Sequence, residues 1–372
     1  MSETSIAREL DLKWLEAELR RTGAGYVLLQ APLGLRSTAV HIAKALQSSG
    51  FRTAISSSNC WGGCDMPYEE AKALGVDTII HVGHTPFMRR DPIRTIYLEC
   101  RYTDPSPILE LIPHINDKLG DVRRVGLAAS LQWLGFIDLV SERLKEAGFE
   151  TVTCKPSMFS KYCGQVLGCD YSSLMPLRKS VDAYLIIGSV FHGLGAALLS
   201  SKRTYAVDPH TQSVKELSWM REKTLRQRYA NILAFRNSRR VGVLTSMKPG
   251  QARLGLGKMV RRLLQDNGYE AYNISTNEVD SDRLRDYGLD SYVNTACPRL
   301  SIEDQALFNV PLLLPMETLV ALKLIEWEYV LDHGLLMYPW GWSPSEGAIF
   351  WRIIRGEAVS RRSWQSPEIS CA

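Results

Sequence analysis

The same order of sequence signals occurs three times along this chain, and this repetition limits the folds it can adopt. Each block opens with an apolar run, passes through a loop into a helix-like stretch, and closes with glycine and an aromatic residue. The blocks are GYVLLQAPLGLRSTAVHIAKALQSSGF, RVGLAASLQWLGFIDLVSERLKEAGFE and RVGVLTSMKPGQARLGLGKMVRRLLQDNGYE. A strand, a loop, a helix with a glycine cap and a further strand account for each block.

An aspartate then introduces a second strand in each block. These residues are Asp77, Asp182 and Asp290, and they lie 50, 57 and 49 residues beyond the first valine of their blocks. A third strand follows each time, as TIYLEC, TYAVDP and VPLLLP. Strands that alternate with helices indicate parallel sheets with right-handed crossovers. We predict an α/β fold of three related parallel-sheet units, with domains at residues 1–122, 123–237 and 238–372.

Composition excludes some classes of protein. The 372 residues are 45% hydrophobic, enough for a sizeable core, and the net charge of +4 is too mild to indicate a nucleic-acid surface. The charged N-terminal segment is typical of an amphipathic helix and not of a signal peptide. Apolar runs stay short of the roughly 18 residues of a membrane span. We therefore expect a cytoplasmic protein, no membrane or direct nucleic-acid partner, and reduced cysteines.

The eight cysteines include three at related places in the repeats. Cys64 and Cys169 each precede the block's aspartate by 13 residues, and Cys297 directly follows the second strand of the third block. Loops at the carboxyl ends of parallel strands carry the chemistry of such folds. If the units surround a pseudo-threefold axis, three thiols could meet at its centre. Three thiolates suit an iron-sulfur cluster with one open iron, although free cysteine also serves as a small buried hydrophobe.

Three passages that carry these cysteines resemble a known family. WGGCD with AKALGVDTIIHVGHTPF, then GQVLGCD, then NTACPRLSIED, are similar to the signature segments of the diphthamide synthases, the archaeal enzyme and its two eukaryotic relatives. The resemblance runs from about Tyr26 to Leu322. It implies three α/β units around a pseudo-threefold axis, with a central 4Fe-4S cluster held by Cys64, Cys169 and Cys297. The family's usual Tyr-Gly-Ala-Cys is Trp-Gly-Gly-Cys here.

The resemblance also implies an activity, the first step of diphthamide biosynthesis. The enzyme transfers the 3-amino-3-carboxypropyl group of S-adenosylmethionine to carbon 2 of a histidine imidazole in translation elongation factor two. A reduced cluster opens the bond between sulfur and the γ carbon, which releases methylthioadenosine and an aminocarboxypropyl radical. This chemistry makes it a radical S-adenosylmethionine enzyme of an unusual kind, and it needs an electron donor of unknown identity. The archaeal relatives are homodimers, so a homodimer is expected.

Two further cysteines compete for the ligand role. Cys60 and Cys64 form a CxxxC in CWGGC, similar to the first two thirds of the CxxxCxxC loop of ordinary radical enzymes, but residue 67 is proline. Cys163, six residues before Cys169, raises the same question for the second block. The 13-residue spacing and the family resemblance both favour Cys64 and Cys169, so Cys60 is at most a spare or exchanging ligand.

The substrate's carboxylate and amino groups need anchors. SMKPGQAR follows the first strand of the third block and resembles the archaeal family's Ser-x-Lys-x-Gly-Gln-x-Arg loop. Backbone N–H groups and a lysine at a helix N-terminus can hold an anion. The predicted anchors are Ser246, Lys248, Gly250, Gln251 and Arg299. A solvated loop with ordinary turn residues is the alternative.

Two histidines are candidates for the catalytic proton acceptor. His84 follows the second strand of the first block, and His192 occupies a similar place in the second block. Each is equally well explained as a structural hydrogen-bonding group. The sequence therefore assigns the catalytic role to neither histidine.

Two other stretches invite interpretation. Residues 221–240 hold seven basic residues and one acid, which favours a connecting helix with a solvated face over a docking surface for a protein substrate. The tryptophans at positions 327, 340, 342 and 351 could cover the core or form a subunit interface.

Two rival functions remain. A quinolinate-synthase-like dehydratase also combines three α/β units with three cysteines around one 4Fe-4S cluster, but uses no S-adenosylmethionine. A non-catalytic metal-binding module or assembly factor would carry no redox-active iron. The motifs LGCD and ACPRLSIED favour the diphthamide synthase hypothesis.

Overall fold

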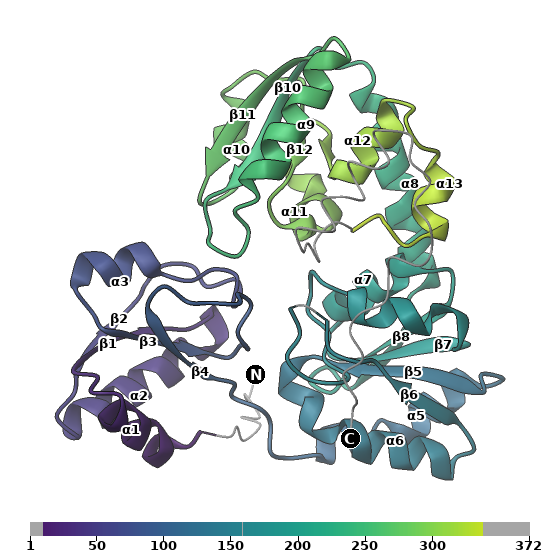
Figure 1. The fold of residues 1–372 in the computed structure, drawn as a ribbon. Coiled ribbons are helices and arrows are strands. Elements are labelled where there is room, and N and C mark those ends of the chain that lie inside the picture. The colour runs from purple at the N-terminus through teal and green to yellow at the C-terminus, as the bar shows by residue number, and fades with distance from the viewer. Residues whose placement is uncertain (1–9, 158, 338–372) are drawn as a thin grey trace. The chain divides into compact units, whose positions relative to one another are not determined.

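Three sheets, each flanked by helices, organise this chain. The computed structural model describes residues 10–157 and 159–337. The strand orders are β2-β1-β3-β4, β6-β5-β7-β8-β9 and β11-β10-β12-β13 (Figure 1). Every neighbouring pair is parallel except β8 and β9, which are antiparallel. The prediction of an α/β fold with three parallel sheets is confirmed, whereas the three domain boundaries stay a prediction.

The first sheet alternates its side chains between two helical layers. Its strands are β1 (Tyr26–Gln30), β2 (Arg52–Ile55), β3 (Thr78–Val82) and β4 (Arg94–Leu98). Helices α1 (Leu12–Arg21) and α2 (Arg36–Ser48) cover one face and α3 (Tyr68–Leu74) the other (Figure 1). Val27 and Leu29 pack with α1 and α2, while Leu28 packs with α3. The two-residue period of a strand places Gln30 with Leu28, toward α3.

The second sheet has the same plan with one added strand. Its strands are β5 (Arg124–Ala129), β6 (Glu150–Thr153), β7 (Ala183–Ile187), β8 (Arg203–Asp208) and β9 (Ser213–Glu216). Its helices are α4 (Ser106–Leu109), α5 (Ile112–Leu119), α6 (Ile137–Glu146) and α7 (Val190–Leu199). Helices α5 and α6 lie on one face and α7 on the other (Figure 1). This sandwich buries both faces of the sheet, as parallel sheets require.

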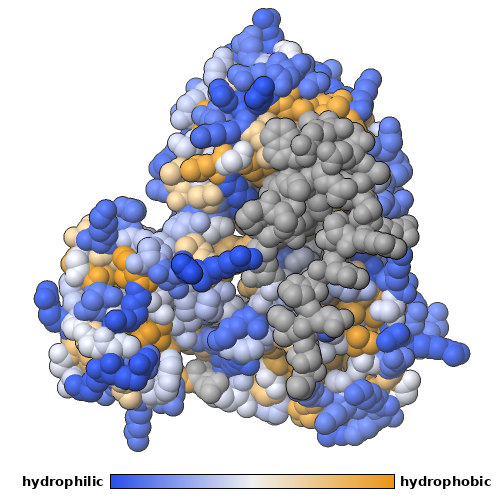
Figure 2. Space-filling model, viewed as in Figure 1, coloured by the Kyte–Doolittle hydropathy of each residue, from blue (hydrophilic) through white to orange (hydrophobic). Residues whose placement is uncertain are grey.

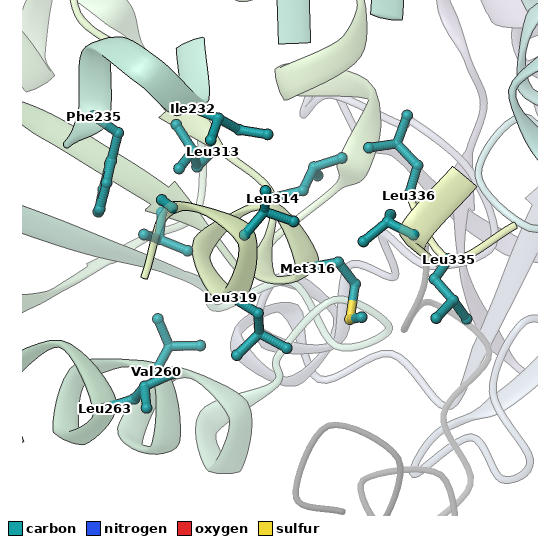
Figure 3. Packing of buried hydrophobic residues seen from close by; sticks show 14 of the residues in the cluster. Ile232, Phe235, Val260, Leu263, Leu313, Leu314, Met316, Leu319, Leu335 and Leu336 are labelled. Carbon is teal, nitrogen blue, oxygen red and sulfur yellow. The ribbon is translucent and has the colours of Figure 1, made fainter. Parts of the chain in front are cut away.

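The third sheet carries the largest of the apolar clusters in the described chain. Its strands are β10 (Arg240–Ser246), β11 (Glu270–Thr276), β12 (Ser291–Asn294) and β13 (Leu312–Leu313). Its helices are α8 (Ser218–Phe235), α9 (Leu254–Asp266), α10 (Ser281–Arg285), α11 (Pro298–Ile302), α12 (Pro315–Ala321) and α13 (Trp327–Asp332). Figure 3 shows Phe235 of α8, Val260 of α9 and Leu319 of α12 within this cluster. The connecting helix predicted from the basic stretch is therefore α8.

Short 3-10 helices connect several elements. They are Leu33–Leu35, Leu131–Phe136, Ser172–Lys179 and Gln305–Leu307. The glycines predicted to end the first helix of each block are Gly50, Gly148 and Gly268, with φ of 90°, 94° and 85°. This left-handed conformation is one that glycine adopts without steric cost, so the predicted caps are confirmed.

The aspartate that repeats in the three blocks makes the same kind of backbone hydrogen bonds in all three. A carboxylate oxygen of Asp77 accepts hydrogen bonds from the backbone N–H groups of Gly25 and Tyr26, at 2.9 and 3.0 Å. Asp182 and Asp290 accept two such bonds each, at 2.8–3.1 Å, from the residues that begin β5 and β10. The spacing found in the sequence therefore marks hydrogen bonds that link the start of the first strand of each block to the strand that the aspartate introduces, which is β3, β7 or β12.

Buried charge joins α8 to the end of the third sheet. Arg228 and Glu317 are both fully buried, and the guanidinium donates Nε–H to Glu317 at 2.7 Å. The same guanidinium donates to the carbonyl oxygens of Ser301 and Leu312, both at 2.7 Å. The basic stretch is thus not a solvated face throughout, because one of its arginines lies in the core.

By internal contacts the chain divides into two compact units. The first comprises the chain up to Ser106 together with Leu131–Phe136 and Lys248–Gly250, and the second comprises the remainder. Hydrophilic residues cover much of the face shown in Figure 2, with smaller hydrophobic groups between them. Among the described residues, no helix combines the length and apolarity needed to cross a membrane.

Candidate functional site

In the first unit, the loop that carries Cys64 is tied to residues of the predicted substrate-binding loop. The N–H of Gly250 donates to the carbonyl oxygen of Cys64 at 2.8 Å. A Cβ atom built on Gly250 would lie 2.5 Å from Cα of Cys64 and 2.7 Å from its Cβ. Only glycine fits so close an approach. Two residues that the sequence placed in one functional site, Cys64 and Gly250, are therefore in contact.

Lys248 reaches the residue that follows Cys64. Its ammonium group lies 2.8 Å from a carboxylate oxygen of Asp65, and the two side chains are 9% and 12% exposed. The backbone carbonyl of Asp65 accepts a hydrogen bond from Nε2 of Gln30 at 2.7 Å. The predicted anchor Lys248 thus lies beside the Cys64 loop, held by a carboxylate.

The other predicted anchors of this loop belong to the second unit. Ser246 ends β10 and is 2% exposed, and Gln251 is 7% exposed. Neither therefore lies on a solvated loop, the alternative that the sequence allowed. Both are buried polar residues, which are satisfied by hydrogen bonds as a rule.

In the second unit, Arg299 interacts electrostatically with both remaining cysteines. Cys297 is the N-cap residue of α11, and its carbonyl oxygen accepts a hydrogen bond from Nδ2 of Asn294 at 2.7 Å. Burial lowers the pKa of the Arg299 guanidinium, while electrostatic interaction with Tyr171, Cys297 and Cys169 acts to raise it. Both thiols therefore act electrostatically on one buried cation, 7% exposed.

An aromatic residue holds Arg299 in place. Its guanidinium carbon lies 3.3 Å from the ring centroid of Phe191, and its NH1 donates to the Phe191 carbonyl oxygen at 2.9 Å. Arg299 also forms an ion pair with Glu303. Stacking and a main-chain bond at one residue fix both the plane and the direction of the guanidinium.

The two candidate histidines have different surroundings. His192 follows Phe191, and its Nδ1 lies 3.3 Å from Oγ of Ser189. Burial, with a smaller contribution from Arg299, lowers its pKa to about 4. His84 lies with Nδ1 2.9 Å from Nε2 of His81, and burial lowers its pKa to about 4 as well. Both imidazoles are therefore neutral near pH 7.

Cys60 is near the histidine pair of the first unit. Its sulfur and one nitrogen of each histidine, His81 and His84, all lie within 4.8 Å of one another. Burial, followed by the charges of Asp65 and Cys64, raises the Cys60 pKa to about 12. The structure thus gives this cysteine imidazole neighbours, which the CxxxC spacing alone did not suggest.

The residues present fit a 4Fe-4S cluster chemically. Cys64, Cys169 and Cys297 form no disulfide, and thiolates are the ligands that such clusters take. A buried cation interacts electrostatically with two of them, and the close approach of Gly250 leaves no room for a side chain beside the third. The ligand assignment itself stays a prediction.

Comparison with known proteins identifies the class. Residues 31–331 match the family described as "Putative diphthamide synthesis protein". The chain is 32% identical to 2-(3-amino-3-carboxypropyl)histidine synthase of Pyrococcus horikoshii over 86% of this chain and 91% of that protein. It is 26% identical to subunit 1 of the same synthase from Nematostella vectensis, over 88% of this chain and 70% of that one.

The fold of a solved relative agrees. The crystal structure of Dph2 from Pyrococcus horikoshii with a 4Fe-4S cluster superposes with a TM-score of 0.79 at 32% identity, covering 87% of this chain and 94% of that one. This chain belongs to the diphthamide synthesis protein family. The family resemblance inferred from the three cysteine motifs is confirmed.

Sequence reasoning missed several residues that shape these sites. No sequence motif singled out Gln30, Asp65 or His81. Asp65 nevertheless follows Cys64 directly, and His81 forms an HxxH with His84. That spacing at a strand end was a usable signal for a paired-histidine site. The tryptophans at 340, 342 and 351 and Cys371 lie outside the described residues, so the interface prediction made for the tryptophans stays untested.

Proposed function

We propose that this chain is a 2-(3-amino-3-carboxypropyl)histidine synthase. It transfers the 3-amino-3-carboxypropyl group of S-adenosylmethionine to C2 of a histidine imidazole in translation elongation factor two, the first step of diphthamide biosynthesis. The observation that carries this proposal is the set of three cysteines outside any disulfide, Cys64, Cys169 and Cys297, in a chain that matches the solved 4Fe-4S relative over 87% of its length.

The reaction sets the requirements for the protein. The bond between the sulfonium sulfur and the γ carbon breaks and a carbon–carbon bond forms at imidazole C2. The resulting radical adduct then loses the C2 proton and one electron, which restores the aromatic ring and balances the electron used in the cleavage. Methylthioadenosine is the leaving product. A 4Fe-4S cluster, when bound, supplies the electron that opens the carbon–sulfur bond. The chain's own side chains must orient the sulfonium, neutralise its carboxylate, exclude water and accept a proton.

Cys64, Cys169 and Cys297 are the proposed cluster ligands. In the second unit, Arg299 supports this role because a buried guanidinium near two thiols favours their charged form. In the first unit, the bond from Gly250 to the Cys64 carbonyl oxygen fixes the backbone that presents the thiol. Precise placement by neighbouring groups is what a site of this kind needs.

Lys248 is the proposed anchor of the substrate carboxylate. Its ammonium is held by Asp65, one residue from the proposed ligand Cys64. A lysine is a compact charge that can exchange one carboxylate partner for another with little rearrangement. Ser246, Gly250, Gln251 and Arg299 are proposed to complete the binding of the substrate's amino-acid end.

His192 is the proposed acceptor of the imidazole proton. It follows Phe191, the residue that holds Arg299, and burial keeps it neutral near pH 7. With Nδ1 directed toward Ser189, Nε2 is the nitrogen we assign to proton transfer. His84, whose Nδ1 lies beside Nε2 of His81, is the other candidate.

Other partners follow from the same proposal. They are translation elongation factor two as protein substrate, an electron donor of unknown identity, and a second copy of this chain in a homodimer. We place the protein in the cytoplasm, where elongation factor two works. Exposed basic residues of α8, such as Arg226, are a proposed docking surface for the protein substrate.

One experiment separates this function from its rivals. The anaerobically reconstituted and reduced protein is incubated with S-adenosylmethionine, and the nucleoside product is identified by mass. Methylthioadenosine is expected. Deoxyadenosine would indicate ordinary radical chemistry, and no product from a loaded, reduced cluster would favour a dehydratase or a binding module.

A further inference from the structure

Cys60, His81 and His84 form a three-residue group in the first unit that includes no proposed cluster ligand and no proposed substrate anchor. Cys60 lies in the loop between β2 and α3, His81 in β3, and His84 two residues beyond β3. The sulfur and one nitrogen of each ring lie within 4.8 Å of one another. Gly83, with φ of 90°, lets the chain turn so that His84 comes back to His81.

A hydrogen-bonded glutamine determines which nitrogen of His81 is free for a ligand. Gln30 lies beside His81 in the pairing of β1 with β3. Its Nε2 donates to the Asp65 carbonyl oxygen at 2.7 Å, so its Oε1 must face Nδ1 of His81, 2.8 Å away. An amide oxygen only accepts, and Nδ1 therefore carries the proton. Nε2 of His81 presents its lone pair toward His84.

This arrangement is the one that metal-binding histidines use. A ligating imidazole donates its second ring N–H to a carbonyl or carboxylate, which fixes the tautomer and the ring orientation. Gln30 does this for His81 in the described structure. The proton between His81 Nε2 and His84 Nδ1 is the one that a cation would replace.

We propose that Cys60, His81 and His84 bind a zinc-like divalent cation. One thiolate and two imidazoles suit zinc, which takes about 2.0–2.1 Å to nitrogen and about 2.3 Å to sulfur. Tetrahedral angles with these bond lengths place two nitrogens about 3.3 Å apart, so the observed 2.9 Å between the rings must widen slightly. The sulfur of Cys60, which lies within 4.8 Å of one nitrogen of each histidine, must also move to bonding distance of the cation.

The bound cation would have a structural consequence. Cys60 is four residues before Cys64, so a bond from its sulfur to a cation on β3 ties the loop of Cys64 to the sheet. Binding also displaces the thiol proton, because the ligand is the thiolate. The inference does not rest on the proposed transfer reaction, because cation binding here needs only these three side chains and no step of that reaction.

The test uses the full chain with the cluster ligands removed. A Cys64→Ala, Cys169→Ala, Cys297→Ala variant is titrated anaerobically with Co²⁺, whose bond to thiolate gives a charge-transfer absorption. We expect one equivalent with this band. Adding Cys60→Ala should abolish the band, and adding Gln30→Ala should weaken binding about 10- to 100-fold. Adding Cys154→Ala, a change in a buried cysteine of the second unit, should leave the titration unchanged.

A second measurement covers the case in which the triple variant does not fold. X-ray absorption at the zinc edge on the reconstituted wild-type chain should show one sulfur and two nitrogens around zinc, and Cys60→Ala should remove the sulfur. The inference is overturned if the folded triple variant binds no Co²⁺, if its band survives Cys60→Ala, or if zinc in the wild type shows no imidazole ligand. Failure here leaves the methylthioadenosine assay unaffected, so the two proposals fail separately.

Discussion

The ammonium group of Lys248 lies 2.8 Å from a carboxylate oxygen of Asp65, 183 residues earlier in the chain. This pair joins the loop after the first strand of the third block to the residue next to Cys64. It places a positive charge close to a proposed cluster ligand, where the proposed substrate needs a partner for its carboxylate. The relationship makes both stability and substrate binding testable at one residue.

Lys248→Met should weaken folding and substrate binding together. Removing one member of a buried ion pair leaves the other charge uncompensated, which costs about 3–5 kcal/mol. Urea unfolding measures the loss, and the Asp65→Asn, Lys248→Met double variant should recover most of it. If Lys248 anchors the carboxylate, the double variant still requires more S-adenosylmethionine for half-maximal rate. An unchanged requirement in the double variant would remove Lys248 from the binding site.

Alanine at Cys64, Cys169 or Cys297 should lower iron content after anaerobic reconstitution, because each change removes one of the three proposed thiolate ligands. Iron and sulfide analysis measures the effect, with circular dichroism to confirm folding. Cys371→Ala is the control and should retain its iron. Equal iron retention in all four variants would overturn the ligand assignment.

Gly250→Ala should disturb the Cys64 loop more than its small size suggests. The added Cβ would lie 2.5 Å from Cα of Cys64, which real structures do not allow, so one backbone must move. We expect the variant to bind less iron after reconstitution, with a free energy of unfolding close to that of the wild type. Gly255→Ala is the matched control because a Cβ there meets nothing within 4 Å. The prediction is wrong if the two variants hold equal iron.

Arg228→Met should be among the more destabilising single changes in the second unit. It leaves Glu317 buried and unpaired and two carbonyl oxygens without their donor, a loss of about 3–5 kcal/mol. Chemical denaturation measures it. Arg226→Met, an exposed position on the same helix, should change stability by less than about 0.5 kcal/mol. Similar effects from both would show that the buried pair is not a stabilising feature.

The repeated aspartates predict a pH dependence of stability. The backbone N–H groups of Arg240 and Arg239, in that order, lower the Asp290 pKa below its ordinary value. A lowered folded-state pKa means that the stabilisation is present at neutral pH and is lost as pH falls through the folded value. Asp290→Ala should therefore be less stable at pH 7 and approach wild type in acid. Thermal unfolding of wild type and variant at pH 7 and at acid pH tests this. The exposed Asp286→Ala is the control and should show no such pH-dependent difference.

The sequence by itself determined the architecture of each of the three sheets with its helices, and the positions of the loops between them. The apolar runs, the glycine caps and the aspartate before the second strand are local signals, because a strand or helix depends on residues within a few positions. They placed Cys297 directly after β12, and they placed Cys64 and Cys169 before the strands β3 and β7. The family motifs then supplied the chemistry that spacing alone left open.

Only the tertiary structure decided which distant side chains meet. Lys248 with Asp65, Arg228 with Glu317, and Cys60 with the pair of histidines join segments separated by tens to nearly two hundred residues. No local pattern encodes these contacts, because parallel strands that are neighbours in a sheet are connected through long crossovers. Burial then decides what the groups do: charged side chains need partners, and thiols and imidazoles stay neutral until a proton or a cation is exchanged.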